Sequence, residues 1–282
     1  MQLGWIDFSK EDREKILDVI NLLQEEGAVD ELGIGVIRDA FSNYFFPGTS
    51  TVQTRAKYLL IVPYILKEAA DGLYGNDVLQ ILKRIDIEEK NCGLLFMKNC
   101  PNEDGIIGKR VLPKGWVSRK PSNIYWNGIR TLGIFSDNSI SISDYISLSN
   151  TIRKQKKNQV NLGNRNDSNE DNESDDIDAV GTQMIPYFTL PGTYKTDWRE
   201  NLTIQLNVDE AVFLRKQILK SIPDTLFAYL LKENIDIGRY ENFEALYMEL
   251  KNKVSDEMEN IMHLACNFNR LVYVARIRYN LM

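Results

Sequence analysis

The sequence predicts a mainly α-helical protein, and three features of its 282 residues support this prediction. Apolar residues recur every three to four positions through several long segments, which is the period of an amphipathic helix. Residues that cap helix N-termini precede these segments, and glycine or proline follows most of them. Hydrophobic residues make up 43% of the chain, so it has enough apolar side chains to form folded cores.

The first expected helix runs from Lys10 to about Glu26, because Ser9 can cap its start and Gly27 can end it. A second helix is expected from Gly35 to Phe45. Proline cannot continue a helix and glycine tolerates a chain reversal, so Pro47-Gly48 should end this second helix in a turn.

A third helix is expected to begin at one of three residues that can cap it, Thr49, Ser50 or Thr51, and to end at about Ala70. It contains the longest apolar run of the chain, residues 58–66, within which a proline should kink the helix. Two interpretations of this region remain open. In the first, it is a helix-turn-helix whose second helix starts with phosphate-binding residues. In the second, the helices form an ordinary bundle around the apolar run.

After a fourth helix, capped by Asn76 or Asp77 and continuing to about Lys98, the chain changes character. Residues 100–148 consist of short apolar pieces separated by Gly, Pro and Asn. The expected elements are a helix over 123–132, a strand pair over 134–142 and a short helix over 143–149. A helix, a glycine stop and a small hairpin together have the outline of a winged-helix element.

Residues 154–180 have no apolar period and are rich in Asn, Asp, Ser and Glu, so we expect a disordered acidic linker. This linker divides the chain into an N-terminal helical domain, residues 1–153, and a C-terminal helical region, residues 181–282. Three or four helices are expected in the C-terminal region, the last one or two from Asn242 onward. The sequence stops inside an apolar pattern without a C-cap, which predicts a truncated chain.

The net charge of −6 conceals a basic segment in the middle of the chain. Residues 98–157 carry 11 basic and 4 acidic side chains, whereas residues 158–180 carry 1 and 7. This arrangement suggests an anionic partner, or an acidic tail that folds back over the basic segment. Trp116, Tyr125 and Trp126 lie among the basic residues, as is typical of phosphate contacts combined with base stacking. The alternative is a solvated loop beside a buried aromatic helix.

The side chains predicted to contact nucleic-acid phosphates fall into two groups. Those around the second helix and the start of the third are Arg38, Thr49, Ser50, Arg55 and Lys57. Those of the basic segment are Lys109, Arg110, Arg119 and Lys120. The first group would use the affinity of a helix N-terminus for anions, and the second would neutralise phosphates directly.

No catalytic, cofactor-binding or metal-binding residue is predicted. The three cysteines are too widely spaced for a zinc site or a disulfide framework, and His263 is the only histidine. Phosphate-loop, nucleophile-elbow and dinucleotide-binding motifs are absent from the sequence. The apolar run 58–66 is far shorter than the roughly 20 residues of a membrane span, and no secretory signal precedes it. We therefore expect a cytoplasmic protein with no membrane partner.

Several segments resemble one bacterial family, known as domain of unknown function 6361. They read LGWIDFSKEDREKIL, GAVDELGIGVIRDAFSNYFFPGTSTVQTRAKYLLIVPYI, GIIGKR followed by PSNIYW, DEAVFLRKQI and LVYVARIRYNLM. Members of that family look longer at the C-terminus, and they are similar to proteins encoded near helicases, nucleases and other phage-defence or mobile-element genes. The resemblance implies a nucleic-acid-associated accessory component of such a system, with a helicase or nuclease as a partner protein. The alternatives are a non-catalytic scaffold that binds a partner protein and an enzyme with an unrecognised site.

Overall fold

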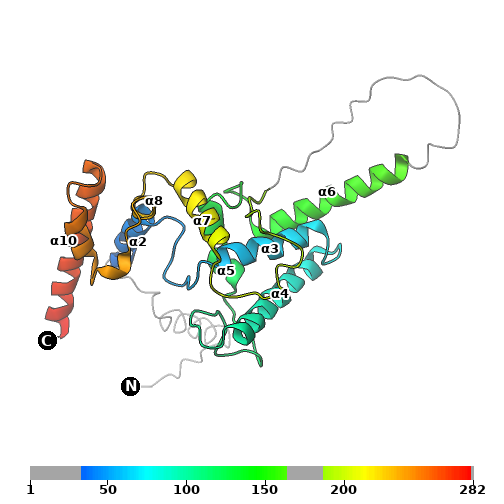
Figure 1. The fold of residues 1–282 in the computed structure, drawn as a ribbon, viewed down its shortest axis with the longest axis horizontal. Helices are drawn as coiled ribbons and strands as arrows, with labels where there is room; N and C mark the ends of the chain where they lie inside the picture. The colour runs from blue at the N-terminus through cyan, green and yellow to red at the C-terminus, as the bar shows by residue number, and fades with distance from the viewer. Residues whose placement is uncertain (1–32, 164–186, 281–282) are drawn as a thin grey trace, which may run out of the picture.

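The computed structural model describes residues 33–163 and 187–280, and it confirms a mainly α-helical fold over these ranges (Figure 1). In chain order its helices are α2 (Ile34–Phe45), α3 (Tyr58–Asp71), α4 (Val78–Asn99), α5 (Pro121–Thr131), α6 (Ile142–Gly163), α7 (Val208–Ser221), α8 (Leu226–Lys232), η1 (Ile237–Arg239), α9 (Phe243–Leu250) and α10 (Asp256–Asn280). Within the described ranges no helix is both long and apolar enough to cross a membrane. The helix predicted over residues 10–26 lies outside them.

Helix α3 lies at the centre of the larger core and packs against α4, α5 and α6. Its apolar run faces neighbours on every side, so almost all of its residues from Tyr58 to Ala70 are buried. A helix that is apolar all round is expected to be buried in this way. The helix includes Pro63, and the kink predicted there stays a prediction.

The predicted start of α3 at residues 49–51 was wrong, because the helix begins only at Tyr58. Gly48 has a left-handed backbone with φ +79°, which turns the chain after α2. The backbone N–H groups of Thr54 and Arg55 then donate to the hydroxyl of Tyr125 on α5, at 2.7 and 2.9 Å, instead of to helix carbonyls. The stretch 46–57 is therefore an irregular segment fixed by α5, and the predicted helix-turn-helix is not observed.

Helix α4 is one helix of 22 residues, capped as predicted by Asp77, whose side chain accepts the N–H of Leu79. The chain that follows it folds back along α4. A Cβ on Gly93 would lie 2.9 Å from a methyl carbon of Leu112, so glycine at this position lets the returning chain lie close to the helix. This return brings Lys120 to Asp86 on α4, with which it forms an ion pair.

The predicted strand pair over 134–142 was also wrong. Residues on both sides of Phe135 bond to a segment beyond the linker instead: Ser136 N–H donates to Tyr187 O at 2.8 Å, and Thr189 N–H donates to Ile134 O at 2.9 Å. The only β contact in the described ranges is the antiparallel bridge between Phe135 and Phe188. The ring of Phe135 also packs against the rings of Tyr187 and Phe188, with centroid distances of 5.4 and 4.9 Å, and this packing fixes the arrangement.

Helix α6 runs to Gly163, so the first ten residues assigned to the disordered linker are helical. The sequence pattern predicts only a short helix here, ending at residue 149. Arg153 helps to anchor α6 beside α3, because its guanidinium donates to Ala70 O at 3.1 Å and to Gly75 O at 2.6 Å. Lys154, Lys156 and Lys157 interrupt the apolar period after Arg153, so the sequence pattern does not reveal the continuation of the helix.

The described residues form two hydrophobic cores, and each contains segments from both sides of residues 164–186. The larger core joins α3 to α6 with residues 188–218. The smaller core joins Phe45 of α2 to α8, α9 and α10. In Figure 1, α2, α8 and α10 accordingly group on one side and α3, α4 and α6 on the other.

Candidate functional site

The predicted phosphate-binding residues near α3 do not share one surface. Lys57 is 6% exposed, and its ammonium lies 2.6 Å from a carboxylate oxygen of Glu210. Arg55 donates to Asp104 O at 2.8 Å and pairs with Glu103 at 2.9 Å. Both cations are therefore engaged in holding segments of the fold together.

The other members of this group lie apart from that pair. Thr49 donates its hydroxyl to Phe46 O at 2.8 Å, and Ser50 is exposed in the same turn. Arg38 is exposed on α2, beside the smaller core, and pairs with Asp39. The turn before α3 thus offers no cluster of free cations.

In the basic segment, residues 98–157, two of the predicted residues are more accessible to solvent than Arg55 and Lys57. Arg110 and Arg119 are exposed, and neither forms an ion pair within the part of the chain that the structure describes. Lys109 donates to Glu103 O at 2.7 Å. Two of the aromatic side chains predicted to stack on bases are buried, Tyr125 at 1% and Trp126 at 8% exposure. For these two residues the alternative to base stacking, a solvated loop beside a buried aromatic helix, agrees with the structure.

Helix α4 adds cations that the sequence analysis missed. Lys83, Asp86 and Lys90 are spaced i, i+3 and i+7, so they lie along one face of the helix. Lys120 pairs with Asp86, so the returning chain, which also carries the exposed Arg119, passes beside this face. We call Lys83, Lys90, Arg119 and Lys120 the α4 basic surface. Over the described ranges, Asp86 is the only acidic side chain that forms an ion pair with any of the four.

Two glutamates explain why this surface was missed. Glu88 and Glu89 make the sequence of α4 look balanced in charge, yet both are buried on the inner side of the helix. Burial raises the pKa of Glu89 to about 8, against the opposing effect of its hydrogen bonds from Ser122. The Ser122 N–H lies 2.6 Å from the Glu89 carboxyl. A carboxyl that is largely protonated near neutral pH cancels little of the positive charge outside.

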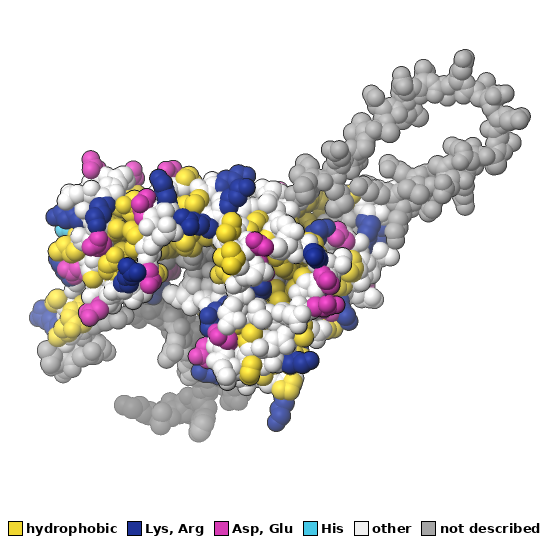
Figure 2. Space-filling view, in the orientation of Figure 1, with side chains coloured by type: hydrophobic (Ala, Val, Ile, Leu, Met, Phe, Trp, Pro, Cys, Tyr) yellow, Lys and Arg dark blue, Asp and Glu magenta, His cyan; other side chains and the backbone are white. Residues whose placement is uncertain are grey.

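On one face of the described residues the basic side chains are dispersed. Figure 2 shows Lys and Arg side chains scattered among Asp and Glu over the face that it draws, without one continuous basic field. The α4 basic surface is therefore a local cluster. Such a cluster suits contact with a few phosphates better than long-range steering of a large polyanion.

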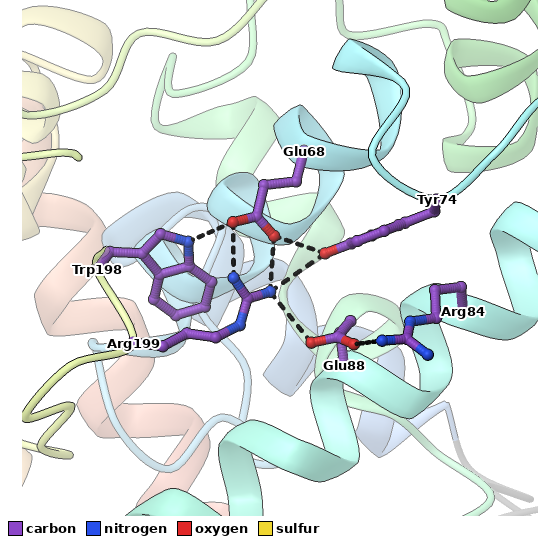
Figure 3. A network of polar contacts seen from close by, with 6 residues as sticks. All are labelled: Glu68, Tyr74, Arg84, Glu88, Trp198 and Arg199. Carbon is purple, nitrogen blue, oxygen red and sulfur yellow. Dashed lines mark hydrogen bonds and ion pairs between the residues drawn. The ribbon is translucent and has the colours of Figure 1, made fainter. Parts of the chain in front are cut away.

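A second polar site connects α3, α4 and the segment before α7 (Figure 3). The guanidinium of Arg199 donates two parallel hydrogen bonds of 2.6 Å to the carboxylate of Glu68. It also lies 3.2 Å from Glu88, which pairs in turn with Arg84 at 2.8 Å. Bidentate arginine–carboxylate pairs are among the strongest polar contacts in proteins. Arg199 thus holds residues 187–207 against α3 and α4.

The carboxylate of Glu68 is fully coordinated within this network. Tyr74 and Trp198 also donate to it, at 2.6 and 2.8 Å. Burial alone would raise the pKa of Glu68, but the hydrogen bonds from Arg199, Tyr74 and Trp198 outweigh burial and hold it below its ordinary value. An ionised carboxylate that accepts from three partners is poorly suited to act as a general base.

A surface hollow of about 680 Å³ lies beside the network. Its lining consists of all the residues labelled in Figure 3 except Trp198, together with Leu73, Gln80, Lys83 and Ile87. The charges of Arg84 and Arg199 cancel those of Glu68 and Glu88 at the floor of the hollow. Among its lining residues, the charge without an opposite partner is that of Lys83. The described residues contain no group of three or more His, Cys, Asp or Glu side chains placed to hold a metal ion.

Comparison with known families identifies a match to the chain. The profile of a family of unknown function, DUF6361, matches residues 1–177. The chain belongs to DUF6361. The match confirms the resemblance found in the sequence, and it covers all of α2 to α6, including the α4 basic surface. No curated protein and no solved structure matches the chain.

Proposed function

We propose that this DUF6361 protein binds nucleic acid through the α4 basic surface, as an accessory component of a bacterial phage-defence or mobile-element system. The observation that carries the proposal is the set of exposed and half-buried cations on α4 and the returning chain, three of which have no acidic partner among the described residues. Unpaired lysine and arginine side chains held on a rigid helix neutralise phosphates and release their counterions.

The geometry of α4 fits the repeat of a nucleic-acid backbone. Lys83 and Lys90 are seven residues apart, or about 10 Å along the helix at 1.5 Å per residue. This distance covers about three phosphates of one DNA strand at roughly 3.4 Å of helix axis each. We expect Arg119, on the chain that returns along α4, to add a contact beside this line. These lysine and arginine side chains would contact phosphates and not base edges, so binding should be largely independent of the nucleic-acid sequence.

Binding is tested with labelled duplex and single-stranded DNA and the purified full chain, over a series of salt concentrations. We expect affinity to fall steeply as salt rises. Lys83→Ala and Arg119→Ala should each weaken binding to all sequences and should each reduce the slope of log affinity against log salt by about 1. The matched control is Lys216→Ala, which removes an exposed lysine of α7 and should change neither quantity.

Two results would overturn the proposal. One is the absence of binding at low salt, and the other is an equal loss of affinity in Lys216→Ala and Arg119→Ala. Co-purification with a neighbouring gene product, without DNA binding, would instead favour the scaffold alternative.

A further inference from the structure

The outer face of α10 carries apolar side chains that nothing in the described ranges covers. Met258, Met262 and Cys266 mark its inner face, and they are buried in the smaller core. On the opposite side Leu264 and Leu271 are 53% and 70% exposed. Val274, on the same outer side, is 63% exposed.

The exposed side chains form a straight seam. Glu257, Leu264, Leu271 and Arg278 follow one another at intervals of seven residues, and all four are exposed. Asn260, Asn267 and Val274 occupy the positions three residues after the first three of them. A seven-residue repeat drifts by only about 20° per heptad around a helix, so these positions stay on one side over the whole length of α10. This is the pattern of a surface that pairs with another helix.

Other elements occupy the flanks of α10 and leave this seam free. On one flank α2 contacts it, with the rings of Phe41 and Phe268 5.8 Å apart. On the other flank α9 contacts it through an ion pair between Glu244 and Arg270. Single exposed leucines are common on proteins, but an apolar row in line along one helix marks an interaction site.

The charges of the helix specify the orientation of a helical partner. Its first turn is acidic, with Asp256, Glu257 and Glu259. Arg270 and Arg278, which are both exposed, lie in its second half. A second copy of α10 running antiparallel would place the acidic end of each helix beside the basic end of the other. A parallel copy would bring like charges together, which is unfavourable.

We propose that a second copy of this chain docks antiparallel on the outer face of α10. In the resulting symmetric pair, Leu264, Leu271 and Val274 of each copy form the apolar seam, and Glu257 of each copy faces Arg278 of the other. The contact is isologous, because both copies use the same surface. Tyr44 of α2 donates its hydroxyl to Glu257 at 3.3 Å and so holds this carboxylate near the seam.

The mass of the full chain in solution, measured by light scattering and by sedimentation, tests the apolar part of the proposal. We expect the mass of two chains at micromolar concentration. Leu271→Glu should weaken the association by roughly a hundredfold or more, because it places two carboxylates in the seam. The matched control is Tyr273→Glu, which changes a side chain of similar exposure on the other side of α10. It should leave the mass unchanged. Helical content of each variant, measured by circular dichroism, shows that loss of the pair is not loss of folding.

A charge exchange tests the orientation. Arg278→Glu should weaken the association by roughly tenfold, because two exposed ion pairs become contacts between like charges. The double variant Glu257→Arg with Arg278→Glu should restore it, since the exchanged charges again meet their opposites in an antiparallel pair. In a parallel pair the double variant would restore nothing. A single-chain mass for the unaltered protein, or a pair that survives Leu271→Glu, would overturn the proposal.

Discussion

The ammonium of Lys57 lies 2.6 and 2.7 Å from the two carboxylate oxygens of Glu210, although 153 residues separate them in the sequence. Both side chains are buried, at 6% and 5% exposure. Lys57 directly precedes α3, and Glu210 belongs to the first turn of α7, where it forms a capping box with Asn207. The pair therefore joins the start of α3 to the start of α7, and these two helices lie on opposite sides of the acidic residues 158–180 in the sequence.

Replacing Lys57 by methionine should lower the free energy of unfolding by about 3 kcal/mol, because Glu210 would remain buried without its partner. Urea denaturation measures the change. Lys67→Met is the matched control, since Lys67 forms a more exposed pair with Asp71 and should cost less than about 1 kcal/mol. The double variant Lys57→Met with Glu210→Gln should be more stable than Lys57→Met alone. Equal losses in Lys57→Met and Lys67→Met would contradict the importance of the buried pair.

Arg199 should not be replaceable by lysine. An ammonium cannot make the two parallel bonds to Glu68 and also reach Glu88, so Arg199→Lys should reduce the free energy of unfolding by about 2 kcal/mol. The same change at Arg215, an exposed residue of α7, should have little effect. Limited proteolysis within residues 187–207 offers a second measurement, because Arg199 is one of the contacts that hold this segment against α3 and α4. Unchanged proteolysis in Arg199→Lys would show that other contacts suffice.

Local patterns in the sequence predicted most of the helices. The apolar period of α2, α4, α5 and α7 lies within each helix, and the capping side chains of α4 and α7, Asp77 and Asn207, directly precede them, so these signals are visible without knowledge of the fold. The predicted start of α3 failed because a distant hydroxyl, that of Tyr125, binds backbone N–H groups of the segment before it. The predicted hairpin failed because the bonding partner of Phe135 is residue 188. In both cases the deciding group lies more than 50 residues away.

The candidate site was harder to predict because its charge depends on which side chains are buried. Arg119 and Lys120 were identified from local composition, whereas Lys83 and Lys90 were not. Glu88 and Glu89 offset these lysines in any count along the sequence, but both glutamates face the interior. The error at Lys57 is the reverse: the sequence predicts an exposed phosphate-binding cation, but the side chain is buried. Net charge along a sequence therefore identifies a surface only once the helix faces are known.

Gly128 should not tolerate even a methyl group. A Cβ at this position of α5 would lie 2.5 Å from the carbonyl oxygen of Gly48, in the turn after α2. Gly128→Ala should therefore cost about 1–3 kcal/mol of stability, because either α5 or the turn must move. Gly115→Ala is the control, since the nearest atom to its added Cβ is 3.7 Å away. Thermal unfolding of the two variants compares them. Equal melting temperatures would show that the turn yields without cost.

The stability of the protein should fall as the pH rises from about 4.5 to about 8, because of Glu89. Burial raises the pKa of this carboxyl to about 8, whereas in the unfolded chain it titrates near its ordinary value of 4.5. Between these two values the folded state binds the proton more strongly, so each increase in pH favours the unfolded state, by at most about 1.4 kcal/mol per pH unit. Glu89→Gln keeps an acceptor for the Ser122 N–H and removes the titration, so its stability should vary less over this range. Nearby Asp86 and Lys120 remain paired in both proteins and cancel in the comparison. Urea denaturation at intervals across this range gives the two curves. Parallel curves would mean that Glu89 is ionised in the folded protein and that the hydrogen bonds from Ser122 outweigh its burial.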